Sequence, residues 1–393
     1  MKTEEWITAR MGELFEKRGE KGEESLPTLS VTIDRGLVRR DSIDRKMDTT
    51  LEPHQHLLVR EGDIAYNMMR MWQGASGRAE VDGIVSPAYV VLRPTTMVDS
   101  HFAAHFFKLP HTIKKFEDYS HGLTSDRLRL YYHDFAAIPT CVPALPEQQK
   151  IAAILSTWDR AIELTEKLIA AKQKCKQALM QQLLTGMVRF VEFGDPIGRN
   201  GSLPEGWNEI ALAKIADVTM GTSPPSAAYN SDEVGLPLIQ GNADIQRRRT
   251  RPRVWTSVLT KTCEIGDCLM SVRAPVGEVA ISEHRACIGR GICGIRAKKE
   301  CYQPFIIQLM LGMEPRWCRI SQGSTFDSVT GQQVKSLPVV VPAIEEQKAI
   351  AAVLNANDKE INLLTQRLHA IKQQKKGLMQ QLLTCKIRIT IKE

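Results

Sequence analysis

The sequence of 393 residues lacks the features that mark membrane and secreted proteins. It contains no run of about eighteen apolar residues, and its first residues, MKTEEWITAR, carry acids where a secretion signal has an apolar core. The nine cysteines are scattered and include no CxxC pair, which indicates free thiols rather than a disulfide framework. These absences predict a cytoplasmic protein without a membrane span.

Signatures of cofactor and metal sites are also missing. There is no GxxxxGK[ST] loop, so ATP use by this chain is not expected. The cysteines at 263 and 268, and those at 287 and 293, lack the spacing of a zinc site, which favours buried thiols. His54 and His56 have no third ligand in sight, so their segment, EPHQH, is expected to form a turn rather than a metal site.

Two short motifs point to structure rather than catalysis. GRGICG (Gly289–Gly294) fits GxGxxG, but the residues after it, IRAKKE, finish a strand instead of opening a helix. We expect a strand with close backbone packing there, not a dinucleotide site. TSPPS (Thr222–Ser226) is similar to the Asn-Pro-Pro-aromatic motif of amino-methyltransferases, but serine occupies both decisive positions. That segment is predicted to be a turn.

What the sequence does contain is a long internal repeat. LMQQLLT, from Leu179 to Thr185, is spelled again from Leu378 to Thr384, 199 positions later. Upstream the register continues without a gap, since Glu147-Gln148 and Glu346-Gln347 have the same offset. A repeat of half the chain predicts two copies of one architectural unit.

The clearest parts of the repeat are two helical segments that each follow a proline and open with glutamate. Apolar residues at spacings of three and four place a stripe on each helix, as in a coiled-coil seam. The stripe consists of Ile151, Leu155, Trp158, Ile162, Ile169, Leu179 and Leu183 in the first helix, and of Ile350, Leu354, Ile361, Leu364, Leu368, Ile371, Leu378 and Leu382 in the second. Neither helix can bury this stripe alone, so each is expected to pair with the other copy.

The segments before the helices repeat more weakly and contain short β-type runs broken by Gly, Pro and Asp. Trp6 matches Trp207, and the Gly-Asp pairs at 62–63 and 266–267 also correspond. Near the end of each segment HGLTSD (His121–Asp126) matches QGSTFD (Gln322–Asp327). The predicted organisation is a mixed α/β domain over 1–142, a long helix over 143–190, a second mixed domain over 191–341 and a second long helix over 342–393.

The second globular segment carries the stronger signal for nucleic acid. QRRRTRPRVW, from Gln246 to Trp255, places five arginines within seven residues, on a predicted loop or strand edge. Clustered cations neutralise phosphates, and an arginine fork can read guanine, whereas a solvated loop is the alternative. Amide and arginine side chains suit base edges. The residues expected to contact DNA are Arg39, Arg40, Arg45, Asn67, Arg70, Gln73 and Arg127 in the first segment, and Gln240, Asn242, Arg247, Arg248, Arg249, Arg251, Arg253, Arg273 and Thr325 in the second.

The doubled helix entry and the alternating layout resemble the DNA-specificity subunit of Type I restriction-modification systems over essentially the whole chain. The residues that carry the resemblance are Pro143, Leu145, Pro146, Glu147, Gln148, Ile151 and Ala152 in one copy, and Pro342, Ile344, Glu346, Gln347, Ile350 and Ala351 in the other. Glu345 replaces the second proline of the motif, which affects only where that helix starts.

The resemblance implies an α+β fold in which two target-recognition domains are separated by two long helices that pair as an antiparallel coiled coil, with pseudo-twofold tandem repeats. Each domain would read one half of a bipartite site in double-stranded DNA, and the helices would hold two modification (methyltransferase) subunits. Restriction subunits would join them. The chain itself would be non-catalytic and bind no cofactor; S-adenosylmethionine would belong to the modification subunits, and ATP and Mg to the restriction subunits.

Two other classes stay open at this point. The chain could be an unusual nuclease or methyltransferase, in which case the isolated chain would bind S-adenosylmethionine. It could also be an adaptor whose coiled coil spaces two protein-binding domains, in which case it would bind no duplex specifically. Trp158 corresponds to Asn357, so the seams differ, and this aromatic residue is expected to face either the sister helix or a partner subunit.

Overall fold

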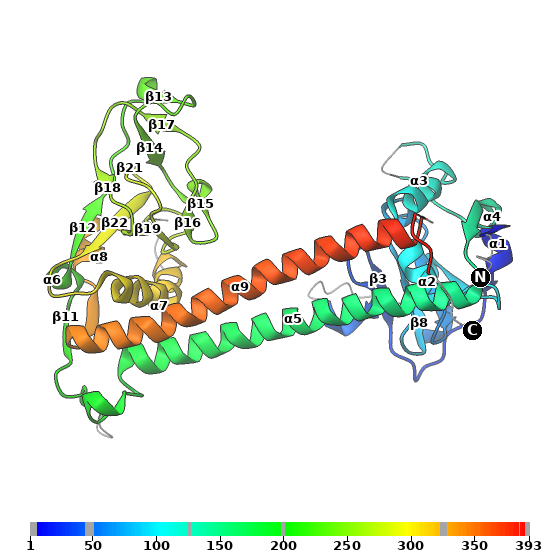
Figure 1. Ribbon diagram of the computed structural model, residues 1–393, viewed down its shortest axis with the longest axis horizontal. Helices are drawn as coiled ribbons and strands as arrows, with labels where there is room; N and C mark the ends of the chain where they lie inside the picture. Colours follow the sequence, from blue (N-terminus) through cyan, green and yellow to red (C-terminus); the bar gives the residue numbers. More distant parts are fainter. Residues whose placement is uncertain are drawn as a thin grey trace. The chain divides into compact units, whose positions relative to one another are not determined.

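The computed structural model describes residues 6–43, 51–124, 127–197, 201–322, 328–384 and 386–389. Contacts divide the chain into two compact units. The first unit comprises residues 1–166 and 366–393, and the second comprises residues 167–365. Each unit contains sheets, short helices and one half of each of two long helices, α5 (Leu145–Thr185) and α9 (Ile344–Leu382) (Figure 1).

The first unit is organised around a four-stranded antiparallel sheet with the order β2-β9-β6-β7. Its strands are β1 (Ile7–Arg10), β2 (Phe15–Arg18), β3 (Leu29–Thr32), β4 (Gly36–Arg39), β5 (Leu57–Val59), β6 (Ile64–Asn67), β7 (Ser76–Arg78), β8 (Gly83–Val85), β9 (Tyr89–Pro94) and β10 (Pro139–Val142). Its short helices are α1 (Met11–Leu14), α2 (Ser100–Phe106), α3 (Pro110–Asp118) and α4 (Tyr132–Ala137). Val90, Val91 and Leu92 are all buried because the sheet is covered on both faces.

The second unit contains the same core sheet, with strand order β12-β22-β19-β20, and a hairpin, β16-β15, added at its edge. Its strands are β11 (Asn208–Ala211), β12 (Ala216–Met220), β13 (Tyr229–Asn230), β14 (Leu236–Ile239), β15 (Ile245–Gln246), β16 (Arg249–Thr250), β17 (Trp255–Thr256), β18 (Thr262–Cys263), β19 (Cys268–Ser271), β20 (Val279–Ile281), β21 (Ala286–Ile288), β22 (Ile292–Ala297) and β23 (Pro338–Val341). Its short helices are α6 (Leu212–Ile215), α7 (Gln303–Gln322) and α8 (Gly331–Lys335).

The weak correspondence between the globular segments is confirmed element by element. The run β1-α1-β2 after Trp6 recurs as β11-α6-β12 after Trp207. The two Gly-Asp pairs make the same turn: Gly62 and Gly266 have φ of 90° and 89°. In each turn the aspartate that follows accepts the backbone N–H three residues before it, at 2.9 Å for Asp63 and 2.8 Å for Asp267.

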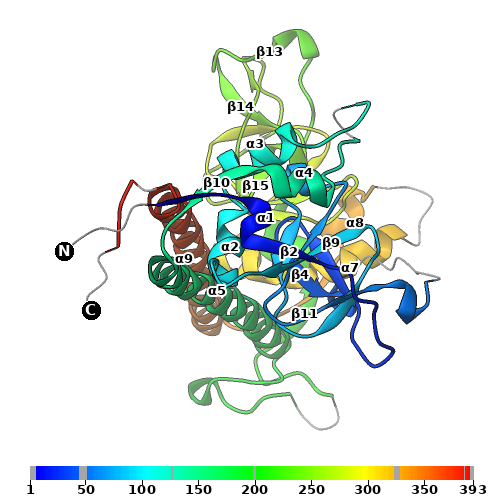
Figure 2. The same cartoon turned by 90° about the vertical axis from the view of Figure 1, so that its right-hand side faces the viewer.

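The two long helices pair antiparallel, as the resemblance implied, and the end-on view in Figure 2 shows them side by side. In the second unit Lys176 donates to Asp358 at 2.6 Å; in the first unit Lys375 donates to Asp159. The two lysines lie 199 positions apart, as do the two aspartates. The same ion pair therefore forms twice: α5 supplies the lysine in the second unit, and α9 supplies it in the first. Lys172–Glu360 and Lys372–Glu166 add a further pair in each unit.

The predicted seam is buried at its ends and partly buried along its middle. Ile151, Leu155, Leu183, Ile350, Leu354 and Leu382 are buried, whereas Trp158, Ile162, Ile169, Leu179, Ile361, Leu364, Leu368, Ile371 and Leu378 are intermediate. The repeated LMQQLLT now has a physical reason. Leu183 and Leu184 pack into the core of the second unit with Ile350 and Leu354, and Leu382 and Leu383 pack into that of the first with Ile151 and Leu155. Each helix end therefore completes the core around the start of the other helix.

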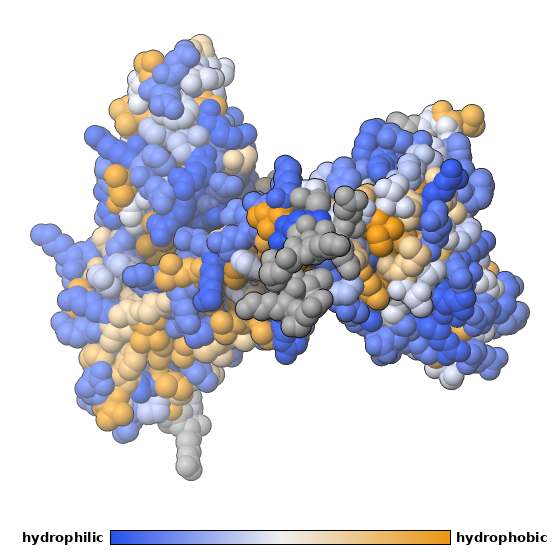
Figure 3. Space-filling model, turned by 45° about the vertical axis from the view of Figure 1, so that its right-hand side comes forward, coloured by the Kyte–Doolittle hydropathy of each residue, from blue (hydrophilic) through white to orange (hydrophobic). Residues whose placement is uncertain are grey.

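Within the parts of the chain that the structure describes, no helix combines the length and apolarity needed to cross a membrane. On the face drawn in Figure 3, hydrophilic residues cover most of the upper part of the second unit, where β13, β14 and β17 lie.

Candidate nucleic-acid interface

In the first unit the predicted contact residues gather on the loop that joins β6 to β7. Asn67 ends β6, and its Oδ1 accepts the backbone N–H of Met69 at 3.0 Å. Arg70 and Gln73 are exposed on the turn that follows. Gly74 closes this turn with φ of 80°, a left-handed conformation that favours glycine. The structure therefore brings three of the seven predicted residues of this segment together on one loop.

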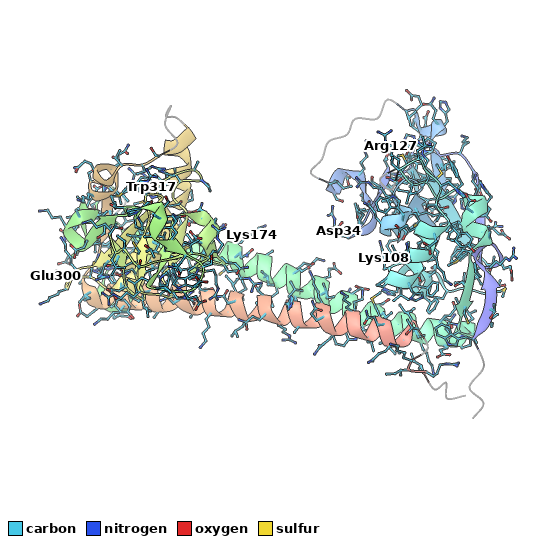
Figure 4. All side chains as sticks on the ribbon, turned by 90° about the horizontal axis from the view of Figure 1, so that it is seen from above. Asp34, Lys108, Arg127, Lys174, Glu300 and Trp317 are labelled. Atoms are coloured by element: carbon cyan, nitrogen blue, oxygen red, sulfur yellow. The ribbon has the colours of Figure 1, made fainter. Side chains whose placement is uncertain are left out.

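A half-buried lysine holds this loop in place. Lys108, just after α2, donates from Nζ to the carbonyl of Gly74 at 2.7 Å and to that of Ile33 at 3.0 Å. Burial lowers the pKa of Lys108 to about 8, against the opposing effect of Asp34, which lies close to it in Figure 4. One ammonium group thus ties the β6–β7 loop to the β3–β4 turn.

The other predicted residues of the first segment do not join this loop in a described contact. Arg39 forms an exposed ion pair with Asp41 at 3.6 Å, and Arg127 is exposed on a turn of its own. The backbone N–H of Arg40 donates to the carbonyl of Thr28 at 2.9 Å. Arg45 lies outside the described residues, as does Thr325 in the second segment.

The second unit has the equivalent loop between β19 and β20, with Arg273 on it. Gly277 closes this loop with φ of 89°, as Gly74 does in the first unit. A Cβ at Gly277 would lie 2.3 Å from Cβ of Trp317 on α7, so the loop rests directly on that buried indole (labelled in Figure 4). On the same helix, Glu314 accepts the backbone N–H of Val279 at 2.8 Å, immediately after the loop.

A pocket of about 250 Å³ brings three predicted residues of the second segment together. Gln240, Asn242 and Arg273 line it, although they come from two separate stretches of the chain. Ser223 and Arg290 line it as well, and neither was expected to contact DNA. Both belong to motifs, TSPPS and GRGICG, that the sequence analysis considered only as enzyme motifs and then assigned to a turn and a strand. A position beside the predicted DNA contacts was therefore not expected for them.

GRGICG forms the start of β22, as predicted, and its glycines allow close packing. A Cβ at Gly291 would lie 2.3 Å from the carbonyl oxygen of Gln240. Gly289 donates its N–H to Ile239 at 2.8 Å. TSPPS has no helix or strand until the short turn that begins at Ser226, and Oγ of Ser223 accepts the N–H of Arg290 at 3.2 Å.

The run of arginines forms a tight hairpin, β15-β16, whose two turn residues are Arg247 and Arg248. Both have positive φ, 50° and 61°, a left-handed conformation that costs about 1 kcal/mol or more for a residue with a Cβ. Arg248 is held by Glu314, to which its Nη2 donates at 2.9 Å, and the hydrogen bonds of this pair raise its pKa. Arg247 has no acidic partner among the described residues.

The remaining arginines of the run are also paired with carboxylates. Arg251 and Arg249 approach Glu283 at 3.1 and 3.9 Å, and Arg253 donates to the buried Asp244 at 2.9 Å. The expectation was a loop or strand edge whose arginines contact phosphates; the structure shows a hairpin in which four of the five arginines form ion pairs with carboxylates of the same unit. Arg247, at the tip, is thus the arginine of the run without an acidic partner among the described residues.

The Glu-Gln pair at each helix start acts as a latch. Glu346 accepts hydrogen bonds from Arg189 at 3.0 and 2.9 Å and from Trp207 at 3.1 Å. In the first unit Glu147 accepts from Arg388, with a shortest contact of 2.8 Å. The two arginines lie 199 positions apart, the offset of the repeat, so a longer alignment would have found them.

The two glutamines of this pair are buried and complete the same latch. Gln148 accepts the N–H of Asp99 at 2.9 Å, and Gln347 accepts that of Tyr302 at 2.9 Å. Each glutamine thereby fixes the start of a long helix to the segment that precedes α2 or α7. The motif that carried the family resemblance is a structural joint, not a reactive site.

The remaining candidates from the sequence are histidine and cysteine side chains. Within the described ranges, no group of three or more His, Cys, Asp or Glu could hold a metal ion. His56 is buried with Nδ1 3.0 Å from the carbonyl oxygen of Glu52, inside the turn predicted for EPHQH. Cys263, Cys268, Cys287 and Cys293 are free, buried thiols, and burial raises the pKa of Cys293 to about 12.

Comparison with known proteins decides among the classes left open by the sequence. A family model described as the Type I restriction modification DNA specificity domain matches residues 58–172 and 204–373, well over half of the chain. The chain belongs to this family. The matched stretches contain both equivalent loops and the whole pocket, so the candidate interface lies within DNA specificity domains.

Relatives of this specificity chain are found in Methanocaldococcus jannaschii. The putative type I restriction enzyme MjaX specificity subunit is 36% identical over 252 residues, which cover 63% of the chain and 59% of that relative. The chain thus aligns with less than two thirds of the length of that relative. The type I restriction enzyme MjaVIII specificity subunit is 23% identical over 360 residues, 86% of the chain and 81% of that relative.

Solved structures share the fold of the specificity chain along nearly its entire length. The S subunit of the Type I restriction-modification system from M. genitalium has a TM-score of 0.63 at 15% identity and covers 98% of the chain and 97% of its own. A chain from a structure of type I R-M system assembly and conformational transition has a TM-score of 0.62 at 22% identity and covers 98% and 99%. At these identities the likeness concerns the fold alone.

Proposed function

We propose that the chain is the non-catalytic specificity subunit of a Type I restriction-modification complex and that each unit reads one half of an asymmetric, bipartite site in double-stranded DNA. The observation that carries the proposal is the pair of equivalent loops. The β6–β7 and β19–β20 loops occupy the same place in the same four-stranded order, yet one presents Arg70 and Gln73 and the other Arg273. Two loops at the same position of the same sheet, with different polar side chains, are suited to recognise two different base sequences.

The helices supply the second part of the proposal. The latches and ion pairs of α5 and α9 fix their register, and the exterior of the pair, where Leu164, Leu168 and Leu363 are exposed by 51%, 44% and 56%, is proposed to dock two modification subunits. These subunits would bring S-adenosylmethionine, and restriction subunits would bring ATP and Mg. The complex would act in the cytoplasm, on DNA. The chain would contribute recognition and spacing only.

The expected target follows from groove geometry. Readers that approach one face of the duplex place half-site centres about one helical turn apart, roughly 10 base pairs. Half-sites of about three or four base pairs then leave a non-specific gap of about six or seven. Mapping methylated positions in DNA exposed to the chain with its modification subunits tests this directly. A single continuous palindrome would contradict the proposal.

Lengthening one helix tests the role of the helices as a spacer. Four residues inserted between Lys172 and Leu179 add roughly 6 Å of rise and about 40° of rotation. A base pair advances about 3.4 Å and turns roughly 35°. The variant complex should prefer gaps one or two base pairs longer while both half-sites keep their bases. Full activity on the original gap alone would show that the helices do not set the spacing.

A further inference from the structure

The pocket beside the β19–β20 loop is lined by two arginines that differ from most arginines of the second unit because they have no acidic partner among the described residues. Most arginine side chains described in the second unit pair with a carboxylate: these are Arg189, Arg248, Arg249, Arg251, Arg253, Arg285 and Arg296. Four have no acidic partner among the described residues, namely Arg247, Arg273, Arg290 and Arg316. Two of these four, Arg273 and Arg290, are exposed and line the same pocket.

The backbone that carries Arg290 is held firmly. Its N–H donates to Ser223, and the flanking Gly289 and Gly291 pack against the Ile239–Gln240 segment without room for a side chain at Gly291. A guanidinium group on a fixed backbone loses less freedom on binding than one on a mobile loop. The exposed guanidinium group of Arg290 can therefore donate hydrogen bonds to a ligand at a low entropic cost.

The pocket also holds an acceptor without a donor. Nδ2 of Asn242 donates to the carbonyl of Pro275 at 3.3 Å, whereas its Oδ1 is buried and meets no donor among the described residues. A buried acceptor left unpaired is destabilising, so a ligand that supplies an N–H to it is favoured on binding. Asn242 thus adds an unpaired acceptor to the pocket that Arg273 and Arg290 also line.

This pattern is complementary to one base pair. In the major groove guanine presents two adjacent acceptors, O6 and N7, which an arginine fork can bond together, and its partner cytosine presents the N4 donor. In an adenine–thymine pair the two acceptors, adenine N7 and thymine O4, are separated by the N6 donor, so an arginine fork cannot bond both. We propose that the pocket reads a G·C base pair in the half-site bound by the second unit, with guanine read by the forks of Arg273 and Arg290 and cytosine N4 bonded to Asn242. The inference rests on the proposed function and deepens it.

Lysine substitutions test the inference because they keep the charge and remove the fork. The chain with its modification subunits is assayed on a library of duplexes in which every half-site position is varied, with Arg273→Lys, Arg290→Lys and, as a matched control, Arg285→Lys, which pairs with Glu264 at 3.4 Å outside the pocket. The wild type should prefer guanine at one position by about tenfold to a hundredfold. Both pocket variants should lose that preference at that position alone.

The outcomes separate this inference from the function it rests on. Normal thermal unfolding of the pocket variants, an unchanged other half-site and wild-type behaviour of Arg285→Lys would support it. Bipartite recognition with no guanine preference affected by either pocket variant, or weakening that is uniform over all bases, would overturn the pocket assignment only. A wild-type complex without sequence preference in either half would overturn the proposed function itself.

Discussion

In the first unit the β6–β7 loop is tied by the ammonium group of Lys108, whereas in the second unit the equivalent β19–β20 loop rests on the indole of Trp317. Both loops end in a left-handed glycine, and both lie at the same place in the sheet. The latch of the second unit is also the more enclosed: the side chains of Arg189 and Glu346 are 6% and 1% exposed, against 26% and 4% for Arg388 and Glu147. The same four-stranded sheet thus accommodates two different side chains beneath the loop, Lys108 and Trp317. The sequence of each loop can therefore change without a change in the other.

The largest expected difference between the units concerns the latches. Glu346→Gln leaves Arg189 buried with an uncompensated charge, which costs about 3 to 5 kcal/mol. Glu147→Gln leaves Arg388 with access to water, so its cost should be about 1 to 3 kcal/mol. Denaturant unfolding followed by hydrogen exchange in each unit measures both losses. Equal losses would mean that the enclosure of the second latch has no energetic effect.

The loop glycines should differ next. Gly277→Ala forces a Cβ against Cβ of Trp317, which cannot turn away, and adds left-handed strain, for a loss of about 2 to 4 kcal/mol. Gly74→Ala would meet only Cδ1 of Ile113 at 2.8 Å, the far end of a flexible side chain. Its cost should stay near the backbone strain of about 1 to 2 kcal/mol. Thermal unfolding of the two variants decides, and a larger loss for Gly74→Ala would reverse the comparison.

Lys108 should give the stability of the first unit a dependence on pH. The pKa of Lys108 is about 8 in the folded chain against 10.5 for an ordinary lysine, so between these values the unfolded chain holds more protons and stability rises with pH. We expect the gain to reach about 2 kcal/mol. Lys108→Met should abolish it, whereas the exposed Lys114→Met should not. Unfolding free energies at pH 7 and 10 measure this, and the same pH dependence in wild type and Lys108→Met would disprove the assignment.

The smallest effect separates two neighbouring arginines of the β15–β16 hairpin. Arg247→Ala should flatten the dependence of DNA affinity on salt by about one phosphate contact, a change of about 0.9 in slope. Arg248→Ala should leave that slope unchanged, because its guanidinium group is bound to Glu314. Replacing residues 247 to 249 together should equal the Arg247 change within error. An unchanged slope for Arg247→Ala would mean that the hairpin tip points away from DNA.

The parts predicted from the sequence are those that depend on local pattern. The seven-residue repeat and the spacing of Ile151 and Ile350 predicted two paired helices, and Trp6 with Trp207 predicted two related domains. These signals work because a helix face and a turn are set by residues close together in the chain.

The features of the site that the sequence did not predict depend on residues that are distant in the chain. Arg248 seemed available for phosphate until Glu314, 66 residues away, was found bound to it. Arg290 was not predicted because its neighbouring glycines resemble a cofactor motif, and the pocket it shares with Gln240 exists only after four segments of the chain meet. Trp158 is partly buried, and whether it faces the sister helix or a partner subunit stays a prediction.

The discontinuity of the first unit has a consequence for how the protein is made. Its core includes Leu382 and Leu383, and its latch includes Arg388, so residues that are synthesised after the whole second unit complete the unit that begins before it. The second unit is one uninterrupted stretch, 167–365, and all its members are available earlier. Domains usually fold in the order of synthesis, from the N-terminus onward. In this order the second unit is complete before the first, so under the proposed function a nascent chain at that stage would hold only one of its two reading domains.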